Sequence, residues 1–141
     1  MHKLVLDTNT YVSGFLWEGN EAKLIREIGN VKAPCFINKE ILEEIDDVLR
    51  RGKFIEVLRI ADTTADEVIS KIVSLSTMVI GPKLKEKVVK GDKKDDKFIE
   101  CAINAKAEII VSGDEHLLKI KEYKGIKIIT TSEALKILGT N

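Results

Sequence analysis

The chain of 141 residues has the length of one ordinary domain, and 44% of its residues are hydrophobic, enough for a substantial core. We therefore expect a single domain over residues 1–141. The 23 basic and 23 acidic residues cancel, so no net charge draws the chain to nucleic acid or to a membrane, and polyanion binding must rely on local patches. No apolar stretch could span a bilayer and no leader peptide is recognisable, so we expect a cytoplasmic protein without membrane contact.

Five short apolar runs are the candidate strands. They are continuous rather than alternating, which is typical of parallel strands covered by helices on both faces. The runs are Leu4–Leu6, Cys35–Ile37, Met78–Ile80, Ile109–Val111 and Ile126–Ile129. Helical spacing occurs in Glu21–Ile28, Lys39–Arg50, Phe54–Ile60, Ala65–Leu75, Asp95–Ala105 and Ser132–Leu138. This alternation predicts an α/β fold, a three-layer α/β/α sandwich with a central parallel sheet of about five strands.

Carboxylates follow two of the predicted strands. The first strand ends in Asp7-Thr8-Asn9 and the fourth in Ser112-Gly113-Asp114. Ligands of open α/β sheets bind beyond the carboxyl ends of the strands, so the two carboxylates would share a site if these strands are neighbours. Capping of the following helices is the alternative interpretation of each tripeptide.

Two predicted helices supply further acids. Asp95 projects toward the apolar face of its helix, whereas Asp96 points to one side, and capping, shared with Asp92, is again the alternative for Asp95. On the helix from residue 39, Glu44 and Asp46 flank the apolar stripe on opposite borders, and periodicity does not choose between them.

Several carboxylates in one cleft would repel each other unless cations or protons neutralise them. Mg²⁺ or Mn²⁺ suits a site built from Asp and Glu. The two cysteines, Cys35 and Cys101, lack the spacing of a disulfide framework or a zinc site, and we expect both to be buried. The glycine-rich motifs of nucleotide and dinucleotide binding and the serine-hydrolase motif are missing from the sequence.

The order and spacing of these segments resemble the PIN-domain family, in particular the VapC-like ribonucleases that are toxin components of toxin–antitoxin systems. The segments that carry the resemblance are Leu4–Asn9, Glu40–Glu44, Asp92–Ala102 and Val111–Leu118. The resemblance implies a divalent-metal-dependent ribonuclease that cleaves single-stranded RNA by means of a metal-activated water.

The resemblance also implies roles for individual residues. Catalytic metal ligands would be Asp7, Glu44, Asp95 and Asp114, which selects Glu44 over Asp46. The acidic cluster would be supported by Asn9, Asp92 and Ser112. His116 stands where relatives commonly have an Asp, which puts one metal position in doubt.

Lysines surround the helix that begins near Asp95, in the stretch from residue 83 to 97. They would supply positive potential for RNA beside the acidic cluster, or simply be solvated. Candidate RNA contacts are Lys93, Lys94, Lys97 and His116. Arg50 and Arg51, by contrast, are interpreted as complementing the dipole at the end of a helix.

Other function classes remain open on the sequence. A catalytically weak or inactive PIN-like module that binds RNA or a protein partner is the main alternative, because of His116. A phosphoaspartyl domain with Asp7 as nucleophile is less consistent, since Asn9 stands where its second Asp is usual. The resemblance implies a homodimer and, for a toxin, a protein antitoxin as partner.

Overall fold

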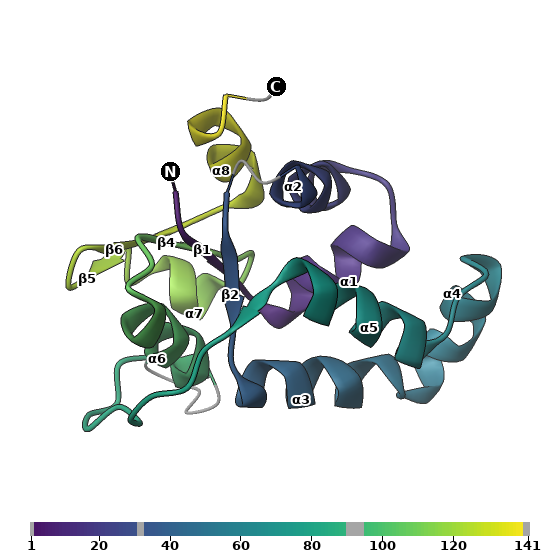
Figure 1. Ribbon diagram of the computed structural model, residues 1–141, viewed down its shortest axis with the longest axis horizontal. Helices are drawn as coiled ribbons and strands as arrows, with labels where there is room; N and C mark the ends of the chain where they lie inside the picture. Colours follow the sequence, from purple (N-terminus) through teal and green to yellow (C-terminus); the bar gives the residue numbers. More distant parts are fainter. Residues whose placement is uncertain (1, 31–32, 90–94, 140–141) are drawn as a thin grey trace.

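The computed structural model describes residues 2–30, 33–89 and 95–139 (Figure 1). In chain order its elements are β1 (Leu4–Leu6), α1 (Thr8–Leu16), α2 (Asn20–Gly29), β2 (Cys35–Ile37), α3 (Lys39–Leu49), a 3₁₀ helix (Gly52–Phe54), α4 (Ile55–Ile60), α5 (Ala65–Leu75), β3 (Thr77–Met78), α6 (Asp96–Ala105), β4 (Ile109–Val111), α7 (Glu115–Leu118), β5 (Glu122–Tyr123), β6 (Ile126–Ile129) and α8 (Thr131–Ile137).

The strands form one sheet in the order β3-β2-β1-β4-β6-β5. The first five of these are parallel, and β5 pairs antiparallel with β6 at one edge. The predicted fold class is therefore confirmed. Two details differ: β3 is Thr77–Met78 rather than Met78–Ile80, and β5 was not predicted. A two-residue turn with positive φ at Lys124 and Gly125 joins β5 to β6, and Lys-Gly is not a typical sequence for such a turn.

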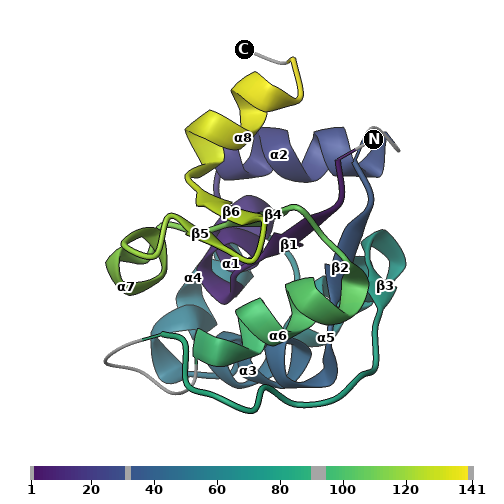
Figure 2. The same ribbon diagram turned by 90° about the vertical axis from the view of Figure 1, so that its left-hand side faces the viewer.

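Helices lie on both sides of this sheet (Figure 2). On one face, α6 contacts β1, β2 and β4 and also touches α3. Beyond the other face, α2 and α8 pack against each other. Helix α1 contacts both α2 and α3, so the segment that follows β1 is surrounded by helices.

Helix α1 was not predicted from the sequence. Its residues include Thr, Asn, Ser and Gly, which have low helix propensity, and tertiary packing stabilises it instead. Gly14 permits the close approach to α2, because a Cβ there would lie 2.5 Å from Ile25 Cγ1 and 3.0 Å from the Glu21 carbonyl oxygen. Because of this close approach, α1 packs against α2 directly after the end of β1.

Tyr11 on α1 is fully buried and its hydroxyl lies 3.0 Å from both Cys35 Sγ and Ser76 Oγ. Because a net hydrogen bond is worth about 1 kcal/mol, we expect Tyr11→Phe to lower the free energy of unfolding by about 1 kcal/mol. Urea titration of both proteins measures this difference. An unchanged midpoint would mean that the hydroxyl contributes nothing to stability.

Cys35 and Cys101 are both buried, as expected from the sequence. Burial raises the pKa of the Cys35 thiol to about 11 and that of Cys101 to about 12, so both are protonated at neutral pH. Neither is a reactive thiolate.

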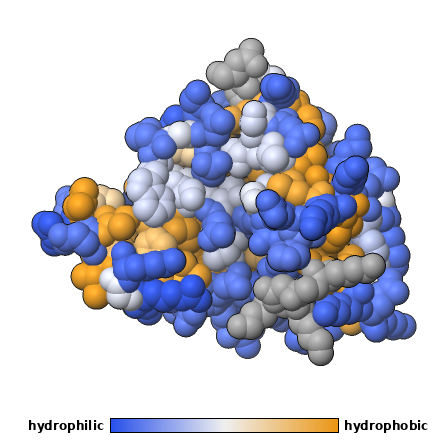
Figure 3. Space-filling model, turned by 180° about the vertical axis from the view of Figure 1, so that it is seen from behind, coloured by the Kyte–Doolittle hydropathy of each residue, from blue (hydrophilic) through white to orange (hydrophobic). Residues whose placement is uncertain are grey.

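Hydrophobic side chains are exposed at the end of the molecule that carries α4. Ile55 is 69% exposed and Ile60 73% exposed, and no residue of this helix is buried. Figure 3 shows hydrophobic surface interspersed with charged groups at this end, seen from behind. Within the described residues, no helix is long and apolar enough to cross a bilayer.

Candidate metal centre

The carboxyl ends of β1 and β4 lie side by side, because these strands are parallel neighbours with Leu6 opposite Val111. The Asp7 N–H donates to the Val111 carbonyl oxygen at 3.0 Å. The sheet order runs from β1 to β2 on one side and from β1 to β4 on the other, which makes this point a topological switch. Such a switch is where open α/β sheets bind ligands.

A pocket of about 200 Å³ opens at this point. It is lined by residues from the start of α1, from α3, from the start of α6 and from α7. Its acidic residues are Asp7, Glu44, Asp95 and Asp114. The structure therefore brings together the four acids that the resemblance selects, although their role as metal ligands stays a prediction.

Asp7 is the most deeply buried of these acids, with 4% of its surface exposed. One carboxylate oxygen caps α1 by accepting from the Thr10 N–H at 2.9 Å and the Thr10 hydroxyl at 2.6 Å, and the other accepts from Ser112 Oγ at 2.5 Å. Burial raises the pKa of Asp7, while the bonds from Ser112 and Thr10 act in the opposite direction. Asp7 thus both caps a helix and presents a strongly oriented carboxylate to the pocket.

Asp114 also combines capping with a place in the pocket. Its Oδ1 accepts from the N–H groups of His116 at 2.8 Å and Leu117 at 3.3 Å, while its own N–H donates to Ser112 Oγ at 2.9 Å. Ser112 therefore connects Asp7 to Asp114, while its role in supporting a metal centre stays a prediction. His116 is exposed, with its Nδ1 3.6 Å from Asp114 Oδ1.

Glu44 has partners on both carboxylate oxygens. Thr8 Oγ1 donates to Oε1, and Lys97 Nζ lies 3.0 Å from Oε2. Asp46 lies on the other border of α3, where it pairs with Arg50 at 3.0 Å, and Arg50 also binds Asp66 of α5. Asp46 thus faces the side covered by α5, whereas Glu44 faces the pocket.

Asp95 and Asp96 differ as the helical wheel predicts. Asp95 occupies the N-cap position of α6 and lines the pocket, but within the described part of the chain its side chain makes no capping hydrogen bond. Asp96 accepts from the N–H groups of Val88 at 3.2 Å and Val89 at 2.7 Å. Asp96 therefore attaches Val88 and Val89 to α6, a role that could not be predicted from the sequence.

The donor set suits a hard divalent cation. Carboxylate oxygens predominate, and among the described residues no Cys or His pair lines the pocket that would favour zinc. Within these residues, however, no three Asp, Glu, His or Cys side chains are grouped closely enough to hold an ion as they stand. The carboxylates of Asp7, Glu44 and Asp114 are each engaged in hydrogen bonds within the protein. The residue types fit the cation, although the side chains of the described residues do not form a closed ligand set in this arrangement.

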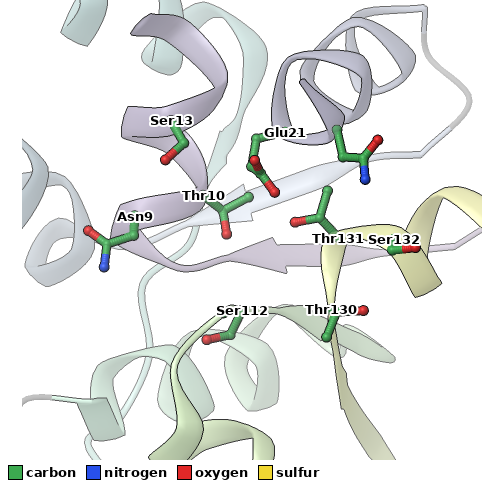
Figure 4. Close-up of a pocket in the computed structure, with 10 residues that line it drawn as sticks. Asn9, Thr10, Ser13, Glu21, Ser112, Thr130, Thr131 and Ser132 are labelled. Atoms are coloured by element: carbon green, nitrogen blue, oxygen red, sulfur yellow. The ribbon is translucent and has the colours of Figure 1, made fainter. Parts of the chain in front are cut away.

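A second pocket of about 380 Å³ adjoins the first and shares Asn9 with it. Hydroxyl, amide and carboxylate side chains line this groove, from α1, α2, the end of β4 and the start of α8. Figure 4 shows Thr10, Glu21 and Thr131 facing its centre, and Ser112, which also lines it, binds Asp7 of the acidic pocket. Asn9, an expected support of the cluster, is exposed between the two pockets.

Sequence reasoning missed two polar residues of the acidic pocket. Thr8 is buried and binds Glu44, although its position directly after Asp7 was a signal. Arg51 lines the pocket and pairs with Asp47 at 3.2 Å, so the interpretation as a helix-dipole partner was incomplete. Three predicted residues, Asp92, Lys93 and Lys94, lie outside the described residues.

Comparisons with known proteins agree with this architecture. The crystal structure of PAE2754 from Pyrobaculum aerophilum is similar over 98% of this chain and 96% of that chain, with a TM-score of 0.66 and 18% sequence identity. At that identity the likeness concerns the fold alone. No curated protein sequence matches the chain.

The sequence itself matches the family described as PIN domain over residues 3–116, a range that contains all four pocket acids. PIN domains are typically nucleases and generally bind divalent metals. The match covers most of the chain and coincides with the sheet and the pocket just described. The chain therefore belongs to the PIN domain family.

Proposed function

We propose that the chain is a divalent-metal-dependent endoribonuclease that hydrolyses single-stranded RNA. The observation that carries this proposal is the convergence of four carboxylates from four separate elements on one pocket at the switch point of the sheet. Helix capping accounts for Asp7 and Asp114 individually, but it does not account for Glu44 and Asp95 in the same pocket. Repulsion between four such groups is relieved by a cation.

In this proposal Asp7, Asp95 and Asp114 hold Mg²⁺ or Mn²⁺, and Glu44 either completes a second metal position or orients the attacking water. A bound divalent ion lowers the pKa of water and stabilises negative charge on phosphodiester oxygens. Ser112 and Thr10 orient the Asp7 carboxylate, and Ser112 also fixes the Asp114 backbone. These bonds hold Asp7 and the backbone of Asp114 at the pocket before substrate arrives.

The surroundings of the pocket suit a nucleic-acid strand. Arg51 places a guanidinium at the rim of the acidic pocket, where it can contact a phosphate. The adjoining groove offers amide and hydroxyl groups such as Asn9 and Thr131 for ribose and base edges. We also propose, from the family resemblance, that the protein is a toxin component with a homodimeric state and a protein antitoxin.

Incubation of the purified protein with a mixed single-stranded RNA tests the activity. We expect cleavage with Mn²⁺ or Mg²⁺ that stops in excess chelator, and products with 5′-phosphate and 3′-hydroxyl ends, because a water rather than the ribose 2′-hydroxyl attacks. Cyclic-phosphate ends would contradict hydrolysis by water. Metal binding without cleavage of any RNA would favour an inactive PIN-like module that binds RNA or a protein.

Glu44 and Asp46 lie on opposite borders of the apolar stripe of α3, so variants of the two residues allow a matched comparison. Glu44→Gln should lower cleavage by about 10- to 100-fold, since residues that support a metal site typically contribute that much. Asp46→Asn should leave cleavage unchanged, because Asp46 pairs with Arg50 away from the pocket. Initial rates on one RNA measure both, and equal rates for the two variants would remove Glu44 from the site.

A further inference from the structure

Lys97 is unusual among the described lysines near the site because its side chain is only 11% exposed. The sequence analysis treats it as a candidate RNA contact. In the structure its ammonium lies 3.0 Å from Glu44 Oε2 and 5.1 Å from the centre of the Phe98 ring. The first turn of α6 carries it inward to α3, so its charge is directed at Glu44 rather than at open solvent.

The position of Lys97 is fixed by its backbone as well. Asn38 caps α3 by accepting from the Ile41 N–H at 2.9 Å, and its Nδ2 donates to the Lys97 carbonyl oxygen at 3.1 Å. Asn38 is itself buried. The start of α3 and the first turn of α6 are thus joined, which keeps the Lys97 backbone beside the helix that carries Glu44.

The contact between Lys97 and Glu44 changes the net charge of the pocket. The four pocket carboxylates carry a formal charge of −4 when ionised, and the ammonium of Lys97 reduces it to −3, while Arg51 at the rim is paired with Asp47. Lys97 thus neutralises the charge of Glu44, and the negative charge of the three aspartates remains to attract a cation. Glu44 has both oxygens engaged, by Thr8 and by Lys97, whereas within the described residues Oδ2 of Asp114 accepts no hydrogen bond.

We propose that Lys97 is a positioning residue whose ammonium occupies the place of a second metal ion at Glu44, so that the centre binds a single divalent cation through its aspartates. This inference rests on the proposed metal-dependent function and decides between the two roles left open for Glu44. Glu44 then orients water or substrate through its fixed carboxylate and is not a metal ligand. Removal of the Lys97 charge frees Glu44 to bind a second cation.

Calorimetric titration with Mn²⁺ alone tests the proposal without any activity measurement. We expect one ion per chain for the wild type, two for Lys97→Met, and one again for the double variant Lys97→Met/Glu44→Gln. Glu44→Gln alone should still bind one ion per chain, since Glu44 is not a ligand. Lys71→Met removes an exposed lysine of α5 and is the matched control, with one ion expected.

The outcomes separate this inference from the proposed function. Two ions in the wild type, one of them lost in Glu44→Gln, would overturn the role of Lys97, as would a single ion in a folded Lys97→Met. If the wild type binds no Mn²⁺, or if Asp7→Asn binds it equally well, the metal centre itself would be overturned. Circular dichroism in chelator verifies that Lys97→Met is folded, and should it unfold, the Glu44→Gln titration still decides the question.

Discussion

Replacement of Asp7 by Asn is expected to reduce RNA cleavage by at least about 100-fold. Supporting residues of metal sites commonly contribute 10- to 100-fold, and a residue that binds the ion directly contributes at least as much. Asp7 is buried, central to the pocket and held from both sides by Thr10 and Ser112. Asn retains one oxygen acceptor but loses the negative charge that attracts the cation.

The substitution should leave the fold intact, which makes the activity loss interpretable. An Asn side chain can keep Oδ1 toward the Thr10 N–H and hydroxyl and turn its NH₂ group toward Ser112 Oγ, which can accept. Single-turnover rates of both proteins in Mn²⁺ measure the loss, with Asp46→Asn as the control. Undiminished cleavage by Asp7→Asn would exclude this pocket as the catalytic site.

Much of the fold could be predicted because the buried parallel strands are continuous apolar runs. Residues such as Leu6 and Val111 stand opposite each other in β1 and β4, and nothing polar interrupts these runs. Helix α1 and strand β5 could not be predicted, since their stability comes from tertiary packing and pairing rather than local propensity. The sequence alone does not show that α2 approaches closely enough to require Gly14.

The candidate site, like the fold, could be predicted from the sequence only in part. Asp7 and Asp114 were accessible from the sequence because strand ends meet at one edge of a parallel sheet. Periodicity left Glu44 and Asp46 equivalent, since it reports the border of an apolar stripe and not which neighbouring helix covers that border. The resemblance selected Glu44, and the contacts of Arg50 with α5 supply the physical reason. The role proposed for Lys97 could not be predicted from the sequence, because it depends on the distance between α3 and α6.

Metal removal is expected to reverse the order of stability between the wild type and Asp7→Asn. Mn²⁺ at 100 times its Kd should stabilise the wild type by about 2.7 kcal/mol and leave Asp7→Asn nearly unchanged. In chelator, Asp7→Asn should be at least as stable as the wild type at neutral pH. The wild type must then bury a carboxyl group whose charged form is disfavoured by burial, whereas the amide carries no charge.

The pH dependence in chelator follows from the raised pKa of Asp7, which burial causes. A raised pKa in the folded state means that the folded chain binds the proton more tightly than the unfolded chain, for which the ordinary value is 3.8. The stability associated with Asp7 is therefore fully present below that value and is lost as the pH rises through the folded pKa.

Urea midpoints of the two proteins in chelator, from acidic to neutral pH, measure this difference. The wild type should lose stability relative to Asp7→Asn with rising pH, and Mn²⁺ at neutral pH should restore the advantage of the wild type. A constant difference across the pH range would mean that the hydrogen bonds of Thr10 and Ser112 fully compensate the burial of the carboxylate. The cation would then be needed for chemistry and not for the stability of the pocket.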